Sequence, residues 1–311
     1  MELQQMRRLA ADIRIDVIRQ LEAFGGGHIG GSMSIADTLA VLYGGLMRVD
    51  PQKPNWPQRD RLVMSKGHCG PALYAALAEC GFFPKEKLLT MNQNGTMLPS
   101  HCSRLLTPGV DASAGSLGQG ISVACGFAMA ARLQNNPCMT YAIVGDGEMQ
   151  EGQVWEAVQF AAHQKLGRFV LIADMNKKQL DGLVDDVCCA FDVPGKFRAF
   201  GFEVYQAQGD DVAQIATCLT EICACSDHVR PSVLLLDSVK GCGCNFAEET
   251  FDNHWIDFDA AMAQSAIDEI ERRLAAGLLP GGGKHRPGLG HGQYHRGVCP
   301  DRPGHPRTLD R

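Results

Sequence analysis

The feature of this chain that most restricts its fold is an alternation of helical patterns with short apolar runs rich in β-branched residues. Five such runs are expected to be strands, at residues 61–65, 140–144, 169–174, 202–206 and 232–237. All five are short and mostly apolar, as strands covered on both faces should be. Because helical patterns separate them, we predict an α/β fold with a parallel sheet and helices on both faces.

Helical periodicity is clearest at the two ends of the expected folded part. In residues 3–24, one face carries Met6, Leu9, Ile13, Val17 and Leu21. A second amphipathic pattern covers residues 258–276. A further helix is expected to begin near Ser34, where Ser-Ile-Ala-Asp has the spacing of a capping box.

Composition and charge separate a body from a tail. Residues 280–311 hold 8 of the 35 glycines and 5 of the 15 prolines, and their net charge of +4 leaves residues 1–279 at −10 out of a total of −6. We predict one acidic folded domain over residues 1–279 and a disordered tail over residues 280–311. A flexible terminus is the simplest interpretation of the tail, and a metal- or anion-binding extension is the alternative.

Several classes of protein are excluded by the same sequence. It has no run of roughly 18 to 20 apolar residues and no apolar signal segment at its start, so a cytoplasmic protein without membrane contact is expected. Its 13 cysteines are irregularly spaced and are predicted to be reduced thiols. The acidic body argues against a nucleic-acid partner.

Polar segments follow two of the expected strands. Gly145-Asp146-Gly147 comes after residues 140–144, and Asp174-Met175-Asn176-Lys177-Lys178 contains the end of residues 169–174. Ligands of open α/β sheets bind at the carboxyl ends of strands, and carboxylate, amide and carbonyl oxygens suit Mg²⁺ or Ca²⁺. The alternative is that Asp146 and Asn176 only cap the segments that follow them.

Four histidines are candidate site residues. His28, His68 and His101 lie among glycine, serine or proline in predicted loops, where there is room for a ligand. Together with His254 they are suited to polarising the hydroxyl and carbonyl groups of a sugar, or to moving protons near neutral pH.

Two histidines also have other interpretations. His163 lies in the apolar pattern FAAHQ and is expected to be a structural core residue. A zinc site formed by Cys242, Cys244 and His254 competes with the sugar-binding interpretation, but a CxC pair with one distant histidine lacks the paired spacing of structural zinc sites.

Taken together, the motifs resemble the amino-terminal half of a transketolase. The matching segments occur in the family's order: GGGHIGGSMS, DRLVMSKGHCGPALYAAL, LPSHCSRLLTPGVDASAGSLGQG, YAIVGDGEMQEGQVWEA, DMNKKQLDG and VKGCGCNF, with His254 beyond. They cover about residues 1–258. The resemblance implies a thiamine-diphosphate-binding fold and a transferase that passes a two-carbon ketol unit from a ketose phosphate to an aldose phosphate.

The resemblance also implies roles for single residues. The family's ligands to the Mg²⁺ or Ca²⁺ that anchors thiamine diphosphate match Asp146, Asn176 and the backbone carbonyl of Lys178. Gly147 and His68 match positions that contact the diphosphate. Residues that hold the aminopyrimidine ring match Gly115, Ser116 and Leu117.

Further matches concern catalysis and assembly. Residues that line the family's substrate channel and assist proton transfer match His28, His101 and His254, with His68 beside them. Acidic residues at the dimer contact between active sites match Glu151 and Glu156; the alternative for both is a solvated first helical turn. The match is altered where Asp-Met-Asn replaces Asp-Asn-Asn, and where a cysteine-rich segment precedes His254.

Transketolases continue into a pyrimidine-binding domain whose glutamate contacts the cofactor. The resemblance therefore implies an amino-terminal subunit of a split enzyme, with a carboxyl-terminal subunit as partner in an α2β2 heterotetramer. The alternatives are a subunit of another thiamine-diphosphate enzyme, such as a deoxyxylulose-phosphate synthase or the alpha chain of a 2-oxoacid dehydrogenase, or a non-catalytic cofactor-binding subunit.

Overall fold

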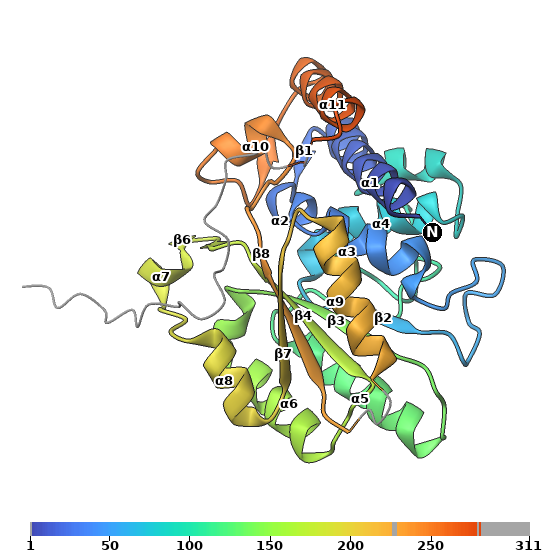
Figure 1. The fold of residues 1–311 in the computed structure, drawn as a ribbon. Coiled ribbons are helices and arrows are strands. Elements are labelled where there is room, and N and C mark those ends of the chain that lie inside the picture. Colours follow the sequence, from blue (N-terminus) through green and yellow to red (C-terminus); the bar gives the residue numbers. More distant parts are fainter. Residues whose placement is uncertain (1, 226–228, 279, 281–311) are drawn as a thin grey trace, which may run out of the picture.

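The computed structural model describes residues 2–225, 229–278 and 280. At its centre is a parallel sheet of five strands in the order β2-β3-β4-β8-β7 (Figure 1). These strands are β2 (Arg61–Met64), β3 (Thr140–Gly145), β4 (Phe169–Met175), β7 (Glu203–Gln208) and β8 (Ser232–Asp237). All five predicted strands are confirmed, and their bounds differ from the predicted ones by at most two residues.

Helices cover both faces of this sheet (Figure 1). On one face lie α1 (Leu3–Phe24), α3 (Ala36–Val41), α4 (Gly70–Glu79), α9 (Val212–Ala224) and α11 (Ala260–Ala275). On the other lie α5 (Gln119–Leu133), α6 (Gly152–His163) and α8 (Val193–Phe200). Each face has its own hydrophobic cluster, so the predicted α/β fold with helices on both faces is confirmed.

Shorter elements connect these layers. Helical turns form α2 (Gly30–Met33), α7 (Val184–Val187) and α10 (Asn245–Glu249). Two small antiparallel pairs join β1 (Gly26–Gly27) to β9 (Ile256–Asp257) and β5 (Lys178–Gln179) to β6 (Gly182–Leu183). The first pair ties the loop after α1 to the segment before α11, so distant parts of the chain meet at one place.

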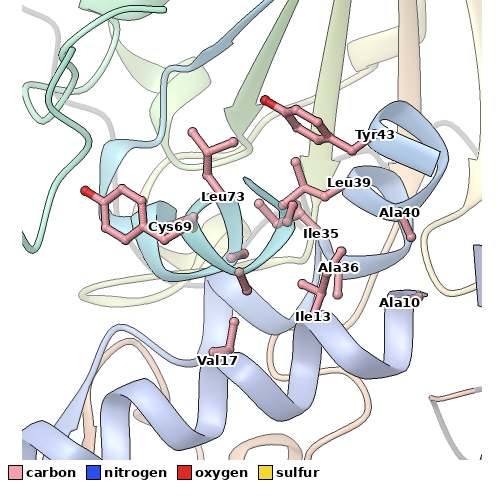
Figure 2. Packing of buried hydrophobic residues seen from close by; sticks show 14 of the residues in the cluster. Ala10, Ile13, Val17, Ile35, Ala36, Leu39, Ala40, Tyr43, Cys69 and Leu73 are labelled. Atoms are coloured by element: carbon pink, nitrogen blue, oxygen red, sulfur yellow. The ribbon is translucent and has the colours of Figure 1, made fainter. Parts of the chain in front are cut away.

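The amphipathic pattern of α1 explains how it packs. Its predicted apolar face packs against α3 and α4 and is buried except for the half-buried Met6, and Figure 2 shows Ile13 close to Ala36. Gly25 ends the helix with φ 98°, a left-handed conformation that glycine adopts without strain. The predicted bounds of this helix are confirmed, and those of the last amphipathic helix are confirmed to within two residues.

The helix predicted to begin near Ser34 begins two residues later, at Ala36, but its predicted cap is wrong. Ser34 does not cap α3, which begins at Ala36 without a side-chain cap. Instead, the Ser34 hydroxyl donates to Asp174 (2.6 Å), and its oxygen also lies 3.0 Å from the carbonyl oxygen of Gly31. A fully buried carboxylate needs such partners, so tertiary contact outweighs local capping here.

Three predictions concern the chain as a whole. No helix among the described residues is long and apolar enough to span a bilayer. The cysteines in this part of the chain are free thiols, as predicted. Residues 281–311 of the predicted tail lie outside the described residues, so its disorder stays a prediction.

Candidate active site

A pocket of about 400 Å³ lies where the carboxyl ends of the parallel strands meet. Four neighbouring strands lead into segments that line it. Lys66 follows β2, Asp146 follows β3, Asn176 follows β4 and Lys240 follows β8. This is the crevice at which open α/β sheets bind ligands, and the sheet alone therefore brings these side chains together.

The four histidines singled out in the sequence also meet in this pocket. The ring centroid of His28 lies 5.6 Å from that of His68, 5.4 Å from that of His101 and 5.2 Å from that of His254. The rings of His68 and His254 are 4.8 Å apart. Segments more than 200 residues apart in sequence thus place four imidazoles around one space.

Burial keeps these imidazoles neutral at pH 7. It lowers the pKa of His28 and of His254 to about 4, with a further contribution from neighbouring cationic groups that include Lys240. Burial also lowers the pKa of His68 and of His101. A neutral imidazole donates one hydrogen bond and accepts another, and Nδ1 of His28 is buried without a hydrogen-bond partner in the structure.

Backbone hydrogen bonds interlock the segments that carry His28, Lys240 and His254. The Gly30 amide donates to the Asn253 carbonyl (3.1 Å), and the Gly241 amide donates to the Gly30 carbonyl (2.9 Å). The side chain of Asn253 donates to the Lys240 carbonyl (2.9 Å). A Cβ on Gly30 would lie 2.2 Å from the Asn253 carbonyl oxygen, so this close approach requires glycine.

The first of the predicted oxygen ligands, Asp146, is fixed by hydrogen bonds. It is buried and accepts from the backbone amides of Gly147 (2.8 Å) and Lys177. Burial, reinforced by the charge of Asp174, raises the pKa of Asp146 to about 7. The Lys177 amide belongs to the turn after β4 and not to the segment that follows Asp146, so capping alone does not account for this carboxylate, which also lines the pocket.

Asn176 is held in one orientation. Its Nδ2 donates to Asp174 (2.8 Å), and its Oδ1 accepts from the Lys178 amide (3.2 Å). An amide oxygen has two lone pairs and the Lys178 amide uses one, so the other is left for a further donor or a cation. Lys178 contributes its backbone carbonyl, which accepts from Nζ of Lys240 at 3.3 Å.

Two buried groups that support the site were not identified from the sequence. Asp174 accepts from Lys66 (2.5 Å), Ser34 and Asn176. Glu148 accepts from the Ser65 hydroxyl (2.5 Å) and from two backbone amides, of Gly118 (2.9 Å) and Gly145 (3.1 Å). For Asp174 the available signal was a charged residue at the end of an apolar strand, whereas Glu148, three residues after β3, had no such signal. Only the tertiary contacts show which partners either carboxylate meets.

The other predicted site residues differ in their placement. Gly115, Leu117 and Glu151 line the pocket. Ser116 and Glu156 are exposed and are not among its lining residues. Glu151 immediately precedes α6, Glu156 lies within it, and both residues are exposed.

Two histidine interpretations are not supported by the structure. The core position predicted for His163 is wrong, because this residue is exposed at the end of α6. The described residues contain no group of three or more His, Cys, Asp or Glu side chains placed to hold a metal ion, so the zinc alternative also fails. Cys242 and Cys244 are instead buried, and burial raises the pKa of both thiols.

Comparison with known proteins points to one family. The family described as "Transketolase, thiamine diphosphate binding domain" matches residues 5–277. A 6-deoxy-6-sulfo-D-fructose transketolase subunit from Clostridium sp. (strain MSTE9) is 43% identical over 263 residues, which is 85% of this chain and 95% of that protein. An apulose-4-phosphate transketolase subunit from Actinobacillus succinogenes is 37% identical over 72% of this chain and 80% of that protein.

Solved structures give the same result. Transketolase from Campylobacter jejuni superimposes with a TM-score of 0.79 at 30% identity, over 90% of this chain and 44% of that one. A mutant transketolase from Pichia stipitis has a TM-score of 0.79 at 26% identity and is matched over 41% of its length. The chain therefore spans about two fifths of the length of these transketolases.

Proposed function

The chain belongs to the transketolase family, and we propose that it is the amino-terminal subunit of a two-chain transketolase. It carries the thiamine-diphosphate-binding domain of that family. The observation that carries the proposal is the pocket itself, in which four neutral histidines share one space with the oxygens of Asp146 and Asn176. Two relatives matched over 95% and 80% of their own length are named as subunits, which supports the two-chain arrangement.

The pocket fits the cofactor and a hard cation. Two buried atoms of residues that line it, Nδ1 of His28 and Oε1 of Gln179, have no hydrogen-bond partner among the described residues. A carboxylate, an amide oxygen and a backbone carbonyl form the donor set that Mg²⁺ or Ca²⁺ prefers. Asp146, Asn176 and the carbonyl of Lys178 would hold this ion.

Other residues would contact the organic cofactor. Gly147 lacks a side chain where the backbone turns into the pocket, and with His68 it would lie against the diphosphate. The segment of Gly115, Ser116 and Leu117 would face the aminopyrimidine ring. When bound, thiamine diphosphate supplies the carbon nucleophile that allows the bond next to a ketose carbonyl to break.

The histidines would transfer protons to and from the sugar and would orient it. Each neutral imidazole presents one N–H donor and one acceptor nitrogen to hydroxyl and carbonyl oxygens. His28 and His254 would act on the reacting oxygens, with His101 and His68 beside them. The proposed reaction moves a two-carbon ketol unit from a ketose phosphate, or a sulfonated ketose, to an aldose phosphate.

The partner is proposed to be a carboxyl-terminal subunit with a pyrimidine-binding domain and its glutamate, in an α2β2 assembly. Glu151 lines the pocket and Glu156 is exposed about one turn further along α6. Both are therefore available to a second chain at this side of the molecule.

Calorimetry and an activity assay test the proposal together. Thiamine diphosphate with Mg²⁺ is titrated into the chain alone and into the chain co-purified with the candidate partner. Ketol transfer is then measured on a panel that includes a 6-sulfo ketose and several ketose phosphates. We expect ketol transfer by the two-chain assembly and none by the isolated chain. Substantial transfer by the isolated chain would contradict the two-chain proposal.

Variants separate a catalytic subunit from one that only binds cofactor. His28→Ala and His254→Ala are each expected to lose at least about 100-fold in kcat, the usual contribution of a positioned acid or base, while cofactor affinity is retained. His163→Ala, which changes an exposed histidine outside the pocket, is the matched control. Full activity of both pocket variants would favour the non-catalytic alternative.

A further inference from the structure

Lys240 is a buried lysine of this pocket whose ammonium group lies beside a histidine. It is 3% exposed, and its Nζ lies 3.3 Å from Nδ1 of His254 and 3.3 Å from the carbonyl oxygen of Lys178. Its aliphatic chain passes Gly30, whose missing Cβ would lie 3.0 Å from Cγ of Lys240. The side chain thus runs through a narrow passage and ends between two fixed polar atoms.

A hydrogen bond from the Lys240 ammonium restricts which ring nitrogen of His254 carries the proton. A lysine ammonium has three donors and no acceptor, so a hydrogen bond to it requires an acceptor. The Lys178 carbonyl meets this requirement in any state. Nδ1 of His254 meets it only when that nitrogen carries no proton, and a neutral imidazole then carries its single proton on Nε2.

We propose that Lys240 is a positioning residue that holds His254 as the neutral tautomer protonated at Nε2, so that this N–H is presented to the substrate. The inference deepens the proposed function and rests on it for the role of the presented N–H. The tautomer itself is a property of this chain and is measurable without activity.

Lys240 keeps this position because the loop around it is held from both ends. Its carbonyl accepts from the side chain of Asn253, the residue next to His254. Two residues further on, the Cys242 carbonyl accepts from Nε of Arg14 at 3.0 Å, and that buried guanidinium pairs with Asp37. Lysine and histidine are therefore attached to the same hydrogen-bonded framework.

Nitrogen-15 NMR of the histidine rings at pH 7 tests the proposal in the intact chain. The His254 signals are assigned by their loss in His254→Gln. In the unaltered protein, Nε2 of His254 is expected to be protonated and Nδ1 to be an unprotonated acceptor. A proton on Nδ1 would overturn the proposal without reference to any variant or to ketol transfer.

The variant Lys240→Met supplies the second arm, because it keeps the length and apolar character of the side chain and removes the donor. The ratio of the two His254 tautomers is expected to shift by about tenfold toward the Nδ1-protonated form, the size expected for one charge-assisted hydrogen bond. Lys53→Met, which removes an exposed lysine, is the control and should leave the ratio unchanged. An unchanged ratio in Lys240→Met would overturn the proposal.

A third readout covers the case in which Lys240→Met does not fold. The Nζ resonance of Lys240 is followed in the unaltered chain and in His254→Gln, with His163→Gln as control. The proposal requires this resonance to move in the first variant and to stay in place in the second. No movement in His254→Gln would show that the two side chains do not interact. A failure of ketol transfer with a confirmed tautomer would count against the proposed function alone.

Discussion

Lys66 and Asp174 form a buried ion pair, with Nζ 2.5 Å from Oδ2, that links the ends of two strands separated by β3. Burial alone would raise the pKa of Asp174, but the charge and hydrogen bond of Lys66 outweigh it and lower the pKa. Lys66 lies two residues before His68 in the segment that follows β2, and Asp174 lies two residues before Asn176 at the end of β4. It therefore fixes a proposed catalytic residue and a proposed metal ligand relative to each other.

Removing one member of this pair should be costly. Lys66→Met leaves Asp174 charged, buried and short of a partner, and we expect a loss of about 3–5 kcal/mol in the free energy of unfolding. Urea unfolding at pH 7 measures this loss. The matched control is Arg230→Met, which breaks an exposed pair with Glu203 and should cost no more than about 1 kcal/mol.

The double variant separates the cost of an unpaired buried charge from the cost of altered side-chain packing. Lys66→Met combined with Asp174→Asn removes both charges, and it should be more stable than Lys66→Met alone because no unpaired charge remains buried. A double variant that is as unstable as the sum of the two single variants would show that the charges do not interact.

Glu148 is expected to support cofactor binding without touching the cofactor. Its carboxylate joins the segment before α5 to the turn after β3, through the amides of Gly118 and Gly145. Glu148→Ala leaves the buried amide of Gly118 and the half-buried amide of Gly145 without this acceptor, at up to about 1–3 kcal/mol each, and loosens both segments. Calorimetry should show weaker binding of thiamine diphosphate, by at least about tenfold. Glu249→Ala, at an exposed position, should leave the affinity unchanged.

The parts of this fold that were predictable are those that depend on local pattern. The five strands and the helix at residues 3–24 follow from periodicity, and they explain why Asp146 and Asn176 share one edge of the sheet. The partner of each polar group was not predictable. Ser34 has the sequence of a helix cap, but a buried carboxylate 140 residues away takes its hydroxyl.

The candidate site was predictable to the same extent. His28, His68 and His101 could be recognised from their loops, yet the meeting of the four histidines depends on contacts among segments that sequence patterns do not relate. His163 illustrates the limit, because an apolar neighbourhood along the chain did not place it in the core. Lys240 and Glu148 have ordinary sequence surroundings, and only the folded structure shows that they contact the site.

Metal-dependent binding should depend on Asp146. Asp146→Asn keeps the shape of the side chain but removes the negative charge that a divalent cation needs. Thiamine diphosphate binding in the presence of Mg²⁺ is expected to weaken by at least about tenfold, and the stimulation by Mg²⁺ should be lost. Asp186→Asn changes an exposed carboxylate outside the pocket and is the control. Equal Mg²⁺ stimulation in both variants would contradict the assignment of this ligand.

Stability should depend on pH through the buried histidines. The folded-state pKa of His254 is about 4, below its ordinary value of 6.5. As the pH falls from about 6.5 to 4, the unfolded chain therefore takes up a proton that the folded chain does not, and the free energy of unfolding decreases. The contribution is complete above pH 6.5. The raised pKa of Asp146 acts with the opposite sign in the same range, so variants must be compared.

His254→Gln isolates this effect. Its free energy of unfolding should fall less than that of the unaltered chain between pH 7 and pH 4.5, when urea midpoints are compared at several pH values. His163→Gln changes an exposed histidine and should follow the unaltered chain. Parallel curves for all three proteins would show that His254 is not held neutral by burial.

The close approach at Gly30 predicts that alanine at this position lowers stability, whereas alanine at a second glycine, Gly126, should raise it. A Cβ at this position would lie 2.2 Å from the Asn253 carbonyl oxygen, so Gly30→Ala must push apart the segments that carry His28 and His254. Forced backbone displacement of this kind costs about 1–3 kcal/mol, and the histidine rings should move with it.

In Gly126→Ala, by contrast, the new methyl group meets no atom within 4 Å on an exposed face of α5. This control should be more stable by up to about 1 kcal/mol, because alanine favours a helix interior. Urea unfolding measures both changes, and the histidine ring resonances report the displacement. A Gly30→Ala chain with unaltered stability and unaltered ring resonances would show that the two segments are not in contact.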